Sequence, residues 1–341
     1  MTLRLLLVHA HPDDETLTHG ATVAAALAQG HDVHLVTCTR GEEGEVIGEA
    51  EQHRTSDRAD TLDELREAEL AAALESLAAG TGREVRHAWL DGLPPGPGAS
   101  RPWPRYRYSG MVVLPGGRAA VPADVRPDCF AVADLDEAAG RLAGLVRRVR
   151  PHVLLTYGPH GGYGHPDHVM AHRVAVRALA LAEDEASSTA AHDGPWRVPL
   201  VYGAAADAEA LRAWLRAQDP AAGAWDPDGP LPHVFVPPAE IDATVRAEAW
   251  LPAKVAALRA LPSQVTVLDD RPGRAALALS NDVPQPLTGT EQGSLLRAPH
   301  PDDLAALPAL DDGDPLAPLL RPGDAGLTDG ARRPRDVAPP G

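Results

Sequence analysis

The sequence contains few cysteines, few aromatic residues and no excess of positive charge. Its 2 cysteines, Cys38 and Cys129, cannot build a disulfide scaffold, which indicates either a reducing, cytoplasmic environment or a protein that does not depend on its redox environment. With only 6 Trp, 5 Tyr and 2 Phe, the core must depend on Leu, Val and Ala. The 31 basic and 48 acidic side chains give a net charge of −17, so the chain lacks the basic surface with which proteins bind nucleic acids or anionic membranes.

Long apolar runs are absent as well. No stretch of about 18 apolar residues occurs, so we expect no membrane-spanning helix. The apolar start, Met1 to Val8, does not have the layout of a signal peptide, because histidines and acidic residues follow it at once. Hydrophobic residues nevertheless make up 44% of the 341 residues, which is enough for one large or two modest domains with an ordinary core.

The first half of the chain alternates short apolar runs with longer helical patterns, as is typical of β-α-β units around a parallel sheet. Leu3 to Val8 is nearly all apolar, as expected for a strand covered on both faces. The pattern then predicts helices over 15–30, 62–79 and 134–149 and strands over 33–38, 85–90 and 153–157. We therefore expect an α/β fold: a Rossmann-like, mostly parallel sheet flanked by helices, with a smaller C-terminal α/β subdomain.

The composition divides the chain into three parts. Residues 1–199 form the predicted catalytic α/β domain, and residues 200–296 form a C-terminal subdomain that completes the substrate cleft. Residues 297–341 are rich in Pro and Asp and lose periodicity, which predicts a poorly ordered tail. Two further stretches, 93–127 and 182–199, have the composition of surface loops or lids.

Two motifs rich in histidine and aspartate follow two of the predicted strands. His-Ala-His-Pro-Asp-Asp-Glu occupies residues 9–15, and Gly-Gly-Tyr-Gly-His-Pro-Asp-His occupies residues 161–168. In an open parallel sheet, ligands bind beyond the carboxyl ends of the strands, so the two motifs should face each other across one crevice. This arrangement predicts a metal site with open positions for water and substrate, whose three ligands are His11, Asp14 and His168.

Two histidines and one carboxylate suit catalytic zinc, and they equally suit iron(II). Either metal would lower the pKa of a bound water and polarise a carbonyl, as hydrolysis of an amide or ester requires. Asp13 is then the natural general base, and Asp167 is placed to orient a ligand imidazole. Tyr163 and His165 are candidates to hydrogen-bond the tetrahedral oxyanion, although Tyr163 also fits a simple packing role.

Residues 9–15 and 161–168 resemble the two signature motifs of the LmbE/PIG-L family of metal-dependent sugar N-deacetylases. The resemblance covers 3–49 and 150–182 closely, and 62–77 and 254–286 more loosely. It implies one zinc ion held by the three ligands named above, Asp13 as base, Asp13 or His165 as the acid for the departing amine, and Tyr163 and His165 around the oxyanion. It also implies that Glu45 and Arg66 contact sugar or inositol hydroxyls. Without such a role, Glu45 would belong to a solvated acidic turn, and Arg66 would form an ion pair on the surface of its helix.

Within the family, the chain is most similar to the mycothiol-pathway branch that removes acetate from N-acetylglucosaminyl-inositol. A sister branch of amidases cleaves mycothiol S-conjugates and shares both motifs. Gly164, Thr18 and the segment Gly41 to Gly48 favour the deacetylase branch, because the amidases are expected to have Pro and Lys near the first two. A third hypothesis is a non-catalytic sugar- or nucleotide-binding module. Asp13 argues against it, because a binding module has no use for a base beside the three ligands. The oligomeric state is left open.

The sequence departs from the family pattern at two places. Tyr108 stands where the family would have an Asp that touches the inositol, which makes the sugar specificity an open question. Leu261, beside Pro262, replaces a family His, so the role of that segment does not transfer.

The remaining histidines and Cys38 have ordinary interpretations. A second His-Pro-Asp-Asp at 300–303 follows no predicted strand and has no partner motif, so we interpret it as chance. His9 shares its strand face with His11, which fits packing as well as support of a ligand. Cys38 ends a predicted strand and is expected to be a core residue without a nucleophilic role. Surface positions or satisfied hydrogen bonds are expected for His19, His31, His34, His53, His87, His152, His160, His172, His192 and His233.

Overall fold

The fold is described from a computed structural model. It covers residues 2–96, 105–113, 119–184, 194–218, 225–271, 273–305 and 307–321. His192, parts of the two predicted loops and the last 20 residues of the predicted tail, 322–341, lie outside these ranges. None of the helices in these ranges is both long and apolar enough to cross a membrane.

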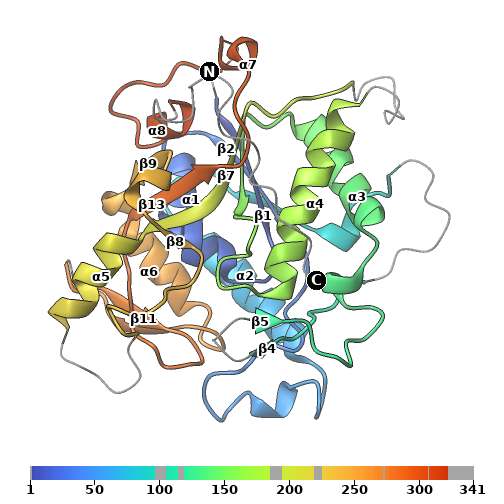
Figure 1. Ribbon diagram of the computed structural model, residues 1–341, viewed down its shortest axis with the longest axis vertical. Helices are drawn as coiled ribbons and strands as arrows, with labels where there is room; N and C mark the ends of the chain where they lie inside the picture. The colour runs from blue at the N-terminus through green and yellow to red at the C-terminus, as the bar shows by residue number, and fades with distance from the viewer. Residues whose placement is uncertain are drawn as a thin grey trace.

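A mixed, mostly parallel sheet forms the centre of the molecule, as the alternating pattern predicts (Figure 1). Its strands run in the order β3-β2-β1-β6-β7-β13-β9, and β8 pairs with β7. The first five in this order are parallel, and β13 is antiparallel to both neighbours. Their bounds are β1 Arg4–His9, β2 Asp32–Thr37, β3 Val85–Trp89, β6 Val153–Tyr157, β7 Leu200–Asp207, β8 Phe235–Val236, β9 Ala243–Arg246 and β13 Thr290–Leu295.

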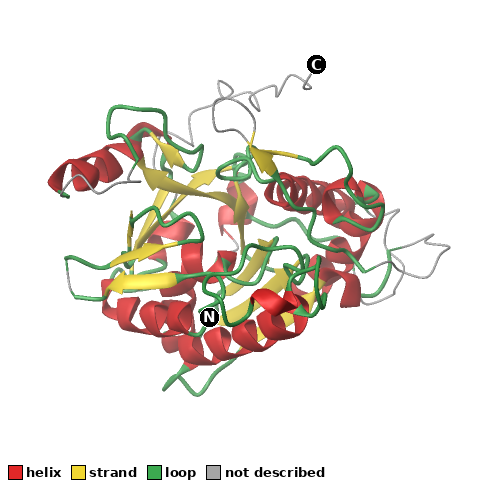
Figure 2. Cartoon of the chain, turned by 90° about the horizontal axis from the view of Figure 1, so that it is seen from below, coloured by secondary structure: helices red, strands yellow, loops and turns green. Residues whose placement is uncertain are grey.

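Helices cover both faces of this sheet (Figure 2). Successive residues of a strand point to opposite faces, so Leu5 and Leu7 of β1 pack with α1, α2 and α6, whereas Leu6 and Val8 pack with α3 and α4. All four leucine and valine side chains are fully buried. The helix bounds are α1 Asp14–Ala28, α2 Leu62–Ala78, α3 Leu135–Val149, α4 Pro166–Glu183, α5 Ala208–Ala217, α6 Leu251–Arg259, α7 Pro301–Ala305 and α8 Ala317–Leu320.

Helix boundaries follow local capping signals. The Asp134 carboxylate accepts the backbone N–H groups of Asp136 and Glu137 at 2.9 and 3.0 Å and so begins α3. The Glu137 side chain does not return to complete a capping box, because it binds Arg141 and Tyr106.

The strand order reverses beside β1. From β1 the chain moves outward to β2 and β3, and it later returns to place β6 on the other side of β1. The carboxyl ends of β1 and β6 are therefore neighbours at a topological switch point, where open α/β sheets bind their ligands. Both histidine motifs begin at these two strand ends.

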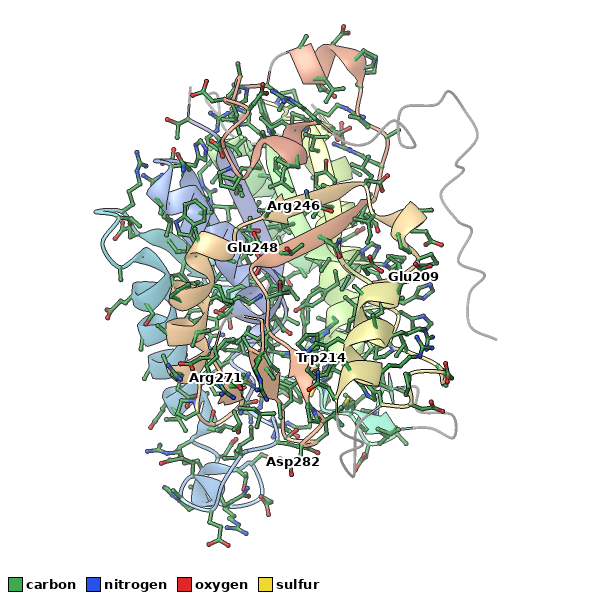
Figure 3. The ribbon with its side chains drawn as sticks, turned by 90° about the vertical axis from the view of Figure 1, so that its left-hand side faces the viewer. Glu209, Trp214, Arg246, Glu248, Arg271 and Asp282 are labelled. Atoms are coloured by element: carbon green, nitrogen blue, oxygen red, sulfur yellow. The ribbon has the colours of Figure 1, made fainter. Side chains whose placement is uncertain are left out.

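The strands after residue 199 extend the same sheet. The pairing of β7, β13 and β9 continues it to its edge, where Thr290 of β13 donates a hydrogen bond to Glu248 just beyond β9. Figure 3 shows this side, with Arg246 and Glu248 beside β13 and the side chain of Trp214 on α5. Two smaller sheets complete the fold: β10 Thr266–Asp269, β11 Ala276–Ala278 and β12 Gln285–Pro286, and the pair β4 Val112–Val113 and β5 Ala119–Ala120.

The described part of the predicted tail, up to residue 321, is folded, which differs from the expectation of disorder. Leu316 and Leu319 are buried in the core that includes Leu5 and Leu7. The Tyr202 hydroxyl donates to the backbone oxygen of Leu319 at 2.9 Å. A few apolar side chains thus anchor a segment whose Pro and Asp content hides its packing, and the second His-Pro-Asp-Asp lies in it at the start of α7.

We predict that His152 makes stability depend on pH. Its Nδ1 accepts the Arg4 N–H at 3.1 Å, and burial, aided by Arg4, lowers its pKa to about 4. The unfolded chain, with a His pKa of about 6.5, then binds more protons between these values, so stability is complete above pH 6.5 and falls toward pH 4. In urea unfolding, His152→Asn should remove this loss, which these two pKa values put at about 3 kcal/mol between pH 7 and pH 4.

The exposed His53 provides the control, since His53→Asn should leave the pH dependence of unfolding as in the wild type. An unchanged slope in His152→Asn would show that this side chain does not contribute.

Candidate metal centre

The first motif forms the turn between β1 and α1. β1 ends at His9, and Asp14 begins the helix, so residues 10–13 cross the carboxyl edge of the sheet. Asp13 adopts a φ of 156°, a backbone conformation that residues with a side chain rarely adopt and that concentrates at functional sites. The Asp14 carboxylate accepts the His11 N–H at 3.0 Å, which closes the turn.

The second motif forms the loop between β6 and α4. His165 is the N-cap of α4: its Nδ1 accepts the Asp167 N–H at 3.1 Å. Gly161 has a φ of 62°, and a Cβ there would lie 2.7 Å from the backbone nitrogen of Val169, so only glycine fits this turn.

The three predicted metal ligands lie together. The distance from His11 Nδ1 to Asp14 Oδ2 is 3.2 Å, and His168 Nε2 lies 3.2 Å from His11 Nδ1 and 3.4 Å from Asp14 Oδ1. Ligand atoms about 2.1 Å from a tetrahedral zinc ion are separated by about 3.4 Å. The spacing and the chemistry of this donor set therefore fit a single divalent metal ion.

The hydrogen bonds behind these side chains aim their free nitrogens at one point. His11 Nε2 donates to Asp167 Oδ2 at 3.2 Å, which leaves Nδ1 as the nitrogen that would bind a metal ion in place of a proton. His168 Nδ1 donates to the Gly161 oxygen at 3.2 Å, which leaves Nε2 free. The Tyr157 hydroxyl donates to Asp14 Oδ2 at 2.6 Å. Such outer contacts orient the ligands of metal sites, and Asp167 has the orienting place that the sequence predicts.

The site favours positive charge. Burial by itself would lower the pKa of His11, but hydrogen bonds to Asp14 and Asp167 raise that pKa to about 9. Burial would likewise favour a neutral Asp14, yet His168 and His11 lower the pKa of this carboxyl well below its usual value. An environment that stabilises a buried proton between carboxylates also stabilises a metal cation.

Asp13 lies beside this cluster with its own partner. Burial raises the pKa of Asp13 to about 6, against the opposing effect of Arg66, whose guanidinium lies 3.2 Å from the carboxylate. Arg66 also donates to the Pro12 and Gly41 oxygens at 3.0 and 3.2 Å. Only 2% of Arg66 is exposed, so its position favours holding the 12–13 turn over contact with a sugar.

The two predicted oxyanion residues border the same site. The ring of Tyr163, with 40% of the residue exposed, lies 5.2 Å from the His168 ring and 5.9 Å from the His165 ring. His165 is buried, and with His11 and His168 it forms a three-histidine group with atoms close enough to hold a metal. Burial, together with the neighbouring histidines, holds the pKa of His165 well below its usual value.

Four other residues that the sequence analysis discusses lie outside the cluster of ligands. Glu45 is exposed, and its backbone oxygen accepts a hydrogen bond from Gln264. His9 is fully buried and packs against the Tyr157 ring at 5.1 Å, and neither of its ring nitrogens has a hydrogen-bond partner among the residues described. Leu261 and Cys38 are fully buried in the core.

The structure adds Ser109 and Glu42, which sequence reasoning missed. Ser109 donates its N–H and its hydroxyl to the Asp167 carboxylate at 2.9 and 2.5 Å. Glu42 is 1% exposed and accepts the Tyr108 N–H at 2.9 Å. The sequence singles out Tyr108 only as a departure from the family, and no spacing signal identifies the other two.

We predict that Ser109→Ala weakens metal binding without removing a ligand. Asp167 would lose a hydroxyl donor and orient His11 less firmly, so metal affinity should fall by roughly 10- to 100-fold. Competition with a chromogenic chelator measures the affinity. Ser76→Ala, which removes an exposed hydroxyl that donates only to the Ala72 oxygen of its own helix, is the control, and equal affinities of the two variants would contradict the prediction.

Comparisons with known proteins show the family to which the chain belongs. The family model described as GlcNAc-PI de-N-acetylase (PIG-L) matches residues 6–179. Over 295 residues the chain is 46% identical to a 1D-myo-inositol 2-acetamido-2-deoxy-alpha-D-glucopyranoside deacetylase of Kineococcus radiotolerans, covering 86% of this chain and 77% of the relative. It is 44% identical to the Kribbella flavida protein of the same name, and the match covers 88% of this chain and 95% of the relative.

A solved structure, the N,N'-diacetylchitobiose deacetylase from Pyrococcus horikoshii, matches with 16% identity and a TM-score of 0.47, covering 76% of this chain and 70% of that one. The sequence relatives and the family match decide the assignment. The chain belongs to the PIG-L family of de-N-acetylases.

Proposed function

We propose that this protein is a zinc-dependent deacetylase that hydrolyses the N-acetyl group of N-acetylglucosaminyl-inositol and releases acetate and the free amine, as a step of mycothiol biosynthesis. The observation that carries the proposal is the convergence of His11, Asp14 and His168, with Asp13 beside them, in a chain 46% identical to a deacetylase named for that substrate. The same donor set also accepts iron(II).

The chain's own residues supply the proton transfers. A divalent metal ion at this site would lower the pKa of water and polarise the acetyl carbonyl. Asp13, with a pKa near 6 and a carboxylate fixed by Arg66, is suited to take a proton from the attacking water at neutral pH. Tyr163 and His165, whose rings border the site on the loop after β6, donate hydrogen bonds to the developing oxyanion in this proposal.

The acid that protonates the departing amine is one of two groups. Asp13 holds the proton it takes from water, and His165 carries its own ring hydrogen near the same point. Arg66 acts through Asp13 in this scheme, and Glu45, on the exposed turn, remains the proposed contact for a sugar or inositol hydroxyl. The chain's lack of a basic phosphate-binding surface agrees with an uncharged substrate.

The assay that tests the proposal measures primary amine. Protein stripped by chelation should be inactive, and zinc or iron(II) should restore release of amine from N-acetylglucosaminyl-inositol. A mycothiol S-conjugate, incubated in parallel, is the comparison substrate. Faster turnover of the conjugate would move the protein to the amidase branch, and failure to bind metal or release amine from either substrate would overturn the enzymatic assignment.

Two substitutions separate the proposed base from the ligands. Asp13→Ala should keep metal bound but lower turnover by at least ~100-fold, because no group then takes the proton from water. His168→Ala should lose metal together with turnover, since two side chains remain to hold the ion. Metal content of the purified variants distinguishes them, and equal loss of metal in both would refute the assignment of roles.

A further inference from the structure

Tyr108 lies in the wall of the metal centre and is held from two sides. Its backbone N–H donates to the buried Glu42 carboxylate at 2.9 Å, and the next residue, Ser109, binds Asp167. Its ring centroid lies 4.5 Å from that of His11 and 5.0 Å from that of His165. A side chain fixed in this way has a defined relation to the metal ligands.

The hydrogen bonds of His165 determine which nitrogen carries its hydrogen. Nδ1 accepts the Asp167 N–H at 3.1 Å, and a ring nitrogen that accepts a hydrogen bond carries no hydrogen. The hydrogen of the neutral ring is therefore on Nε2. That nitrogen lies 2.8 Å from the Tyr108 hydroxyl oxygen, so the Nε2–H donates to Tyr108.

Nε2 could bind a metal ion only if its hydrogen moved to Nδ1 and the hydrogen bond from the Asp167 N–H were given up. The histidine is close enough to His11 and His168 to join them as a ligand. A fourth protein ligand would produce the closed coordination of a structural zinc site, whereas a catalytic site keeps a position open. The role of His165 thus depends on what its Nε2 binds.

We propose that Tyr108 is a positioning residue that holds His165 outside the metal's ligand set: its phenol oxygen accepts the Nε2–H in the free protein, and the acyl group of the substrate takes over that hydrogen bond when it binds. The inference rests on the proposed function, since it concerns the same metal centre. The phenol accepts the Nε2–H and still has its own hydrogen, for which no acceptor is found among the described residues. A carboxylate at this place could accept the Nε2–H but would bring a negative charge and have no hydrogen to donate.

Cobalt(II) in place of zinc gives the proposal a spectroscopic test, because its visible absorption reports the number and type of ligands. Tyr108→Phe removes the hydroxyl and leaves the ring. We expect a changed cobalt(II) spectrum, because the ring hydrogen can then move to Nδ1 and Nε2 can bind the metal, and turnover of N-acetylglucosaminyl-inositol roughly 10- to 100-fold lower with little change in KM. The double variant Tyr108→Phe/His165→Ala should have the spectrum of His165→Ala alone.

Tyr106→Phe is the matched control. It removes a hydroxyl from the same segment, but that hydroxyl donates to Glu137 in the core, so the spectrum should match the wild type. A wild-type spectrum and normal turnover in Tyr108→Phe would overturn the proposal, as would a spectral change that persists without His165. If wild-type protein binds no cobalt and releases no amine, the proposed function itself fails; if it does both, a negative result in Tyr108→Phe counts against this inference alone.

Discussion

The parallel pairing of β1 with β6 is the contact on which the metal centre depends. Leu5, Leu6 and Leu7 lie opposite Val153, Leu154 and Leu155, so the two strands end at the same edge. Tyr157, the last residue of β6, accepts the Ala10 N–H at 2.8 Å and donates to Asp14. This one hydroxyl joins the end of β6 to the first motif. A shift of the register would separate His11 from His168 and remove the site.

A second constraint is the charge buried at this edge. Asp13, Asp14 and Asp167 are brought together where water is largely excluded, and isolated carboxylates are costly in such a place. Arg66 contacts Asp13, and protonated His11 lies between the other two. A divalent cation between Asp14 and the two histidines would take over the compensation that the His11 proton provides. The fold therefore concentrates negative charge where a metal ion would bind. The net charge of −17 does not report this local balance between carboxylates and cations.

The layer behind the ligands comes from a part of the chain with no obvious motif. The segment around Tyr108 and Ser109 is fixed by Glu42, by Asp167 and by the N–H of Ala131, which donates to Ser109. It was expected to be part of a surface loop. Its side chains instead set the hydrogen bonds of His165 and Asp167, so the state of the ligands depends on residues outside the two motifs.

Local signals in the sequence determined much of this protein: the apolar run of β1, the Asp134 cap of α3, the order of strands and helices, and the position of each histidine motif directly after a strand. These features depend on neighbours within a few residues and on the rule that parallel strands end at one edge. The tertiary structure alone decided the burial of Arg66 beneath Asp13, the contact of Tyr108 with His165, the support of Asp167 by Ser109, and the packing of Leu316 and Leu319 under a Pro- and Asp-rich segment. Those contacts join residues distant in sequence, and their hydrogen-bond geometry and burial arise only when the helices and loops pack against the sheet.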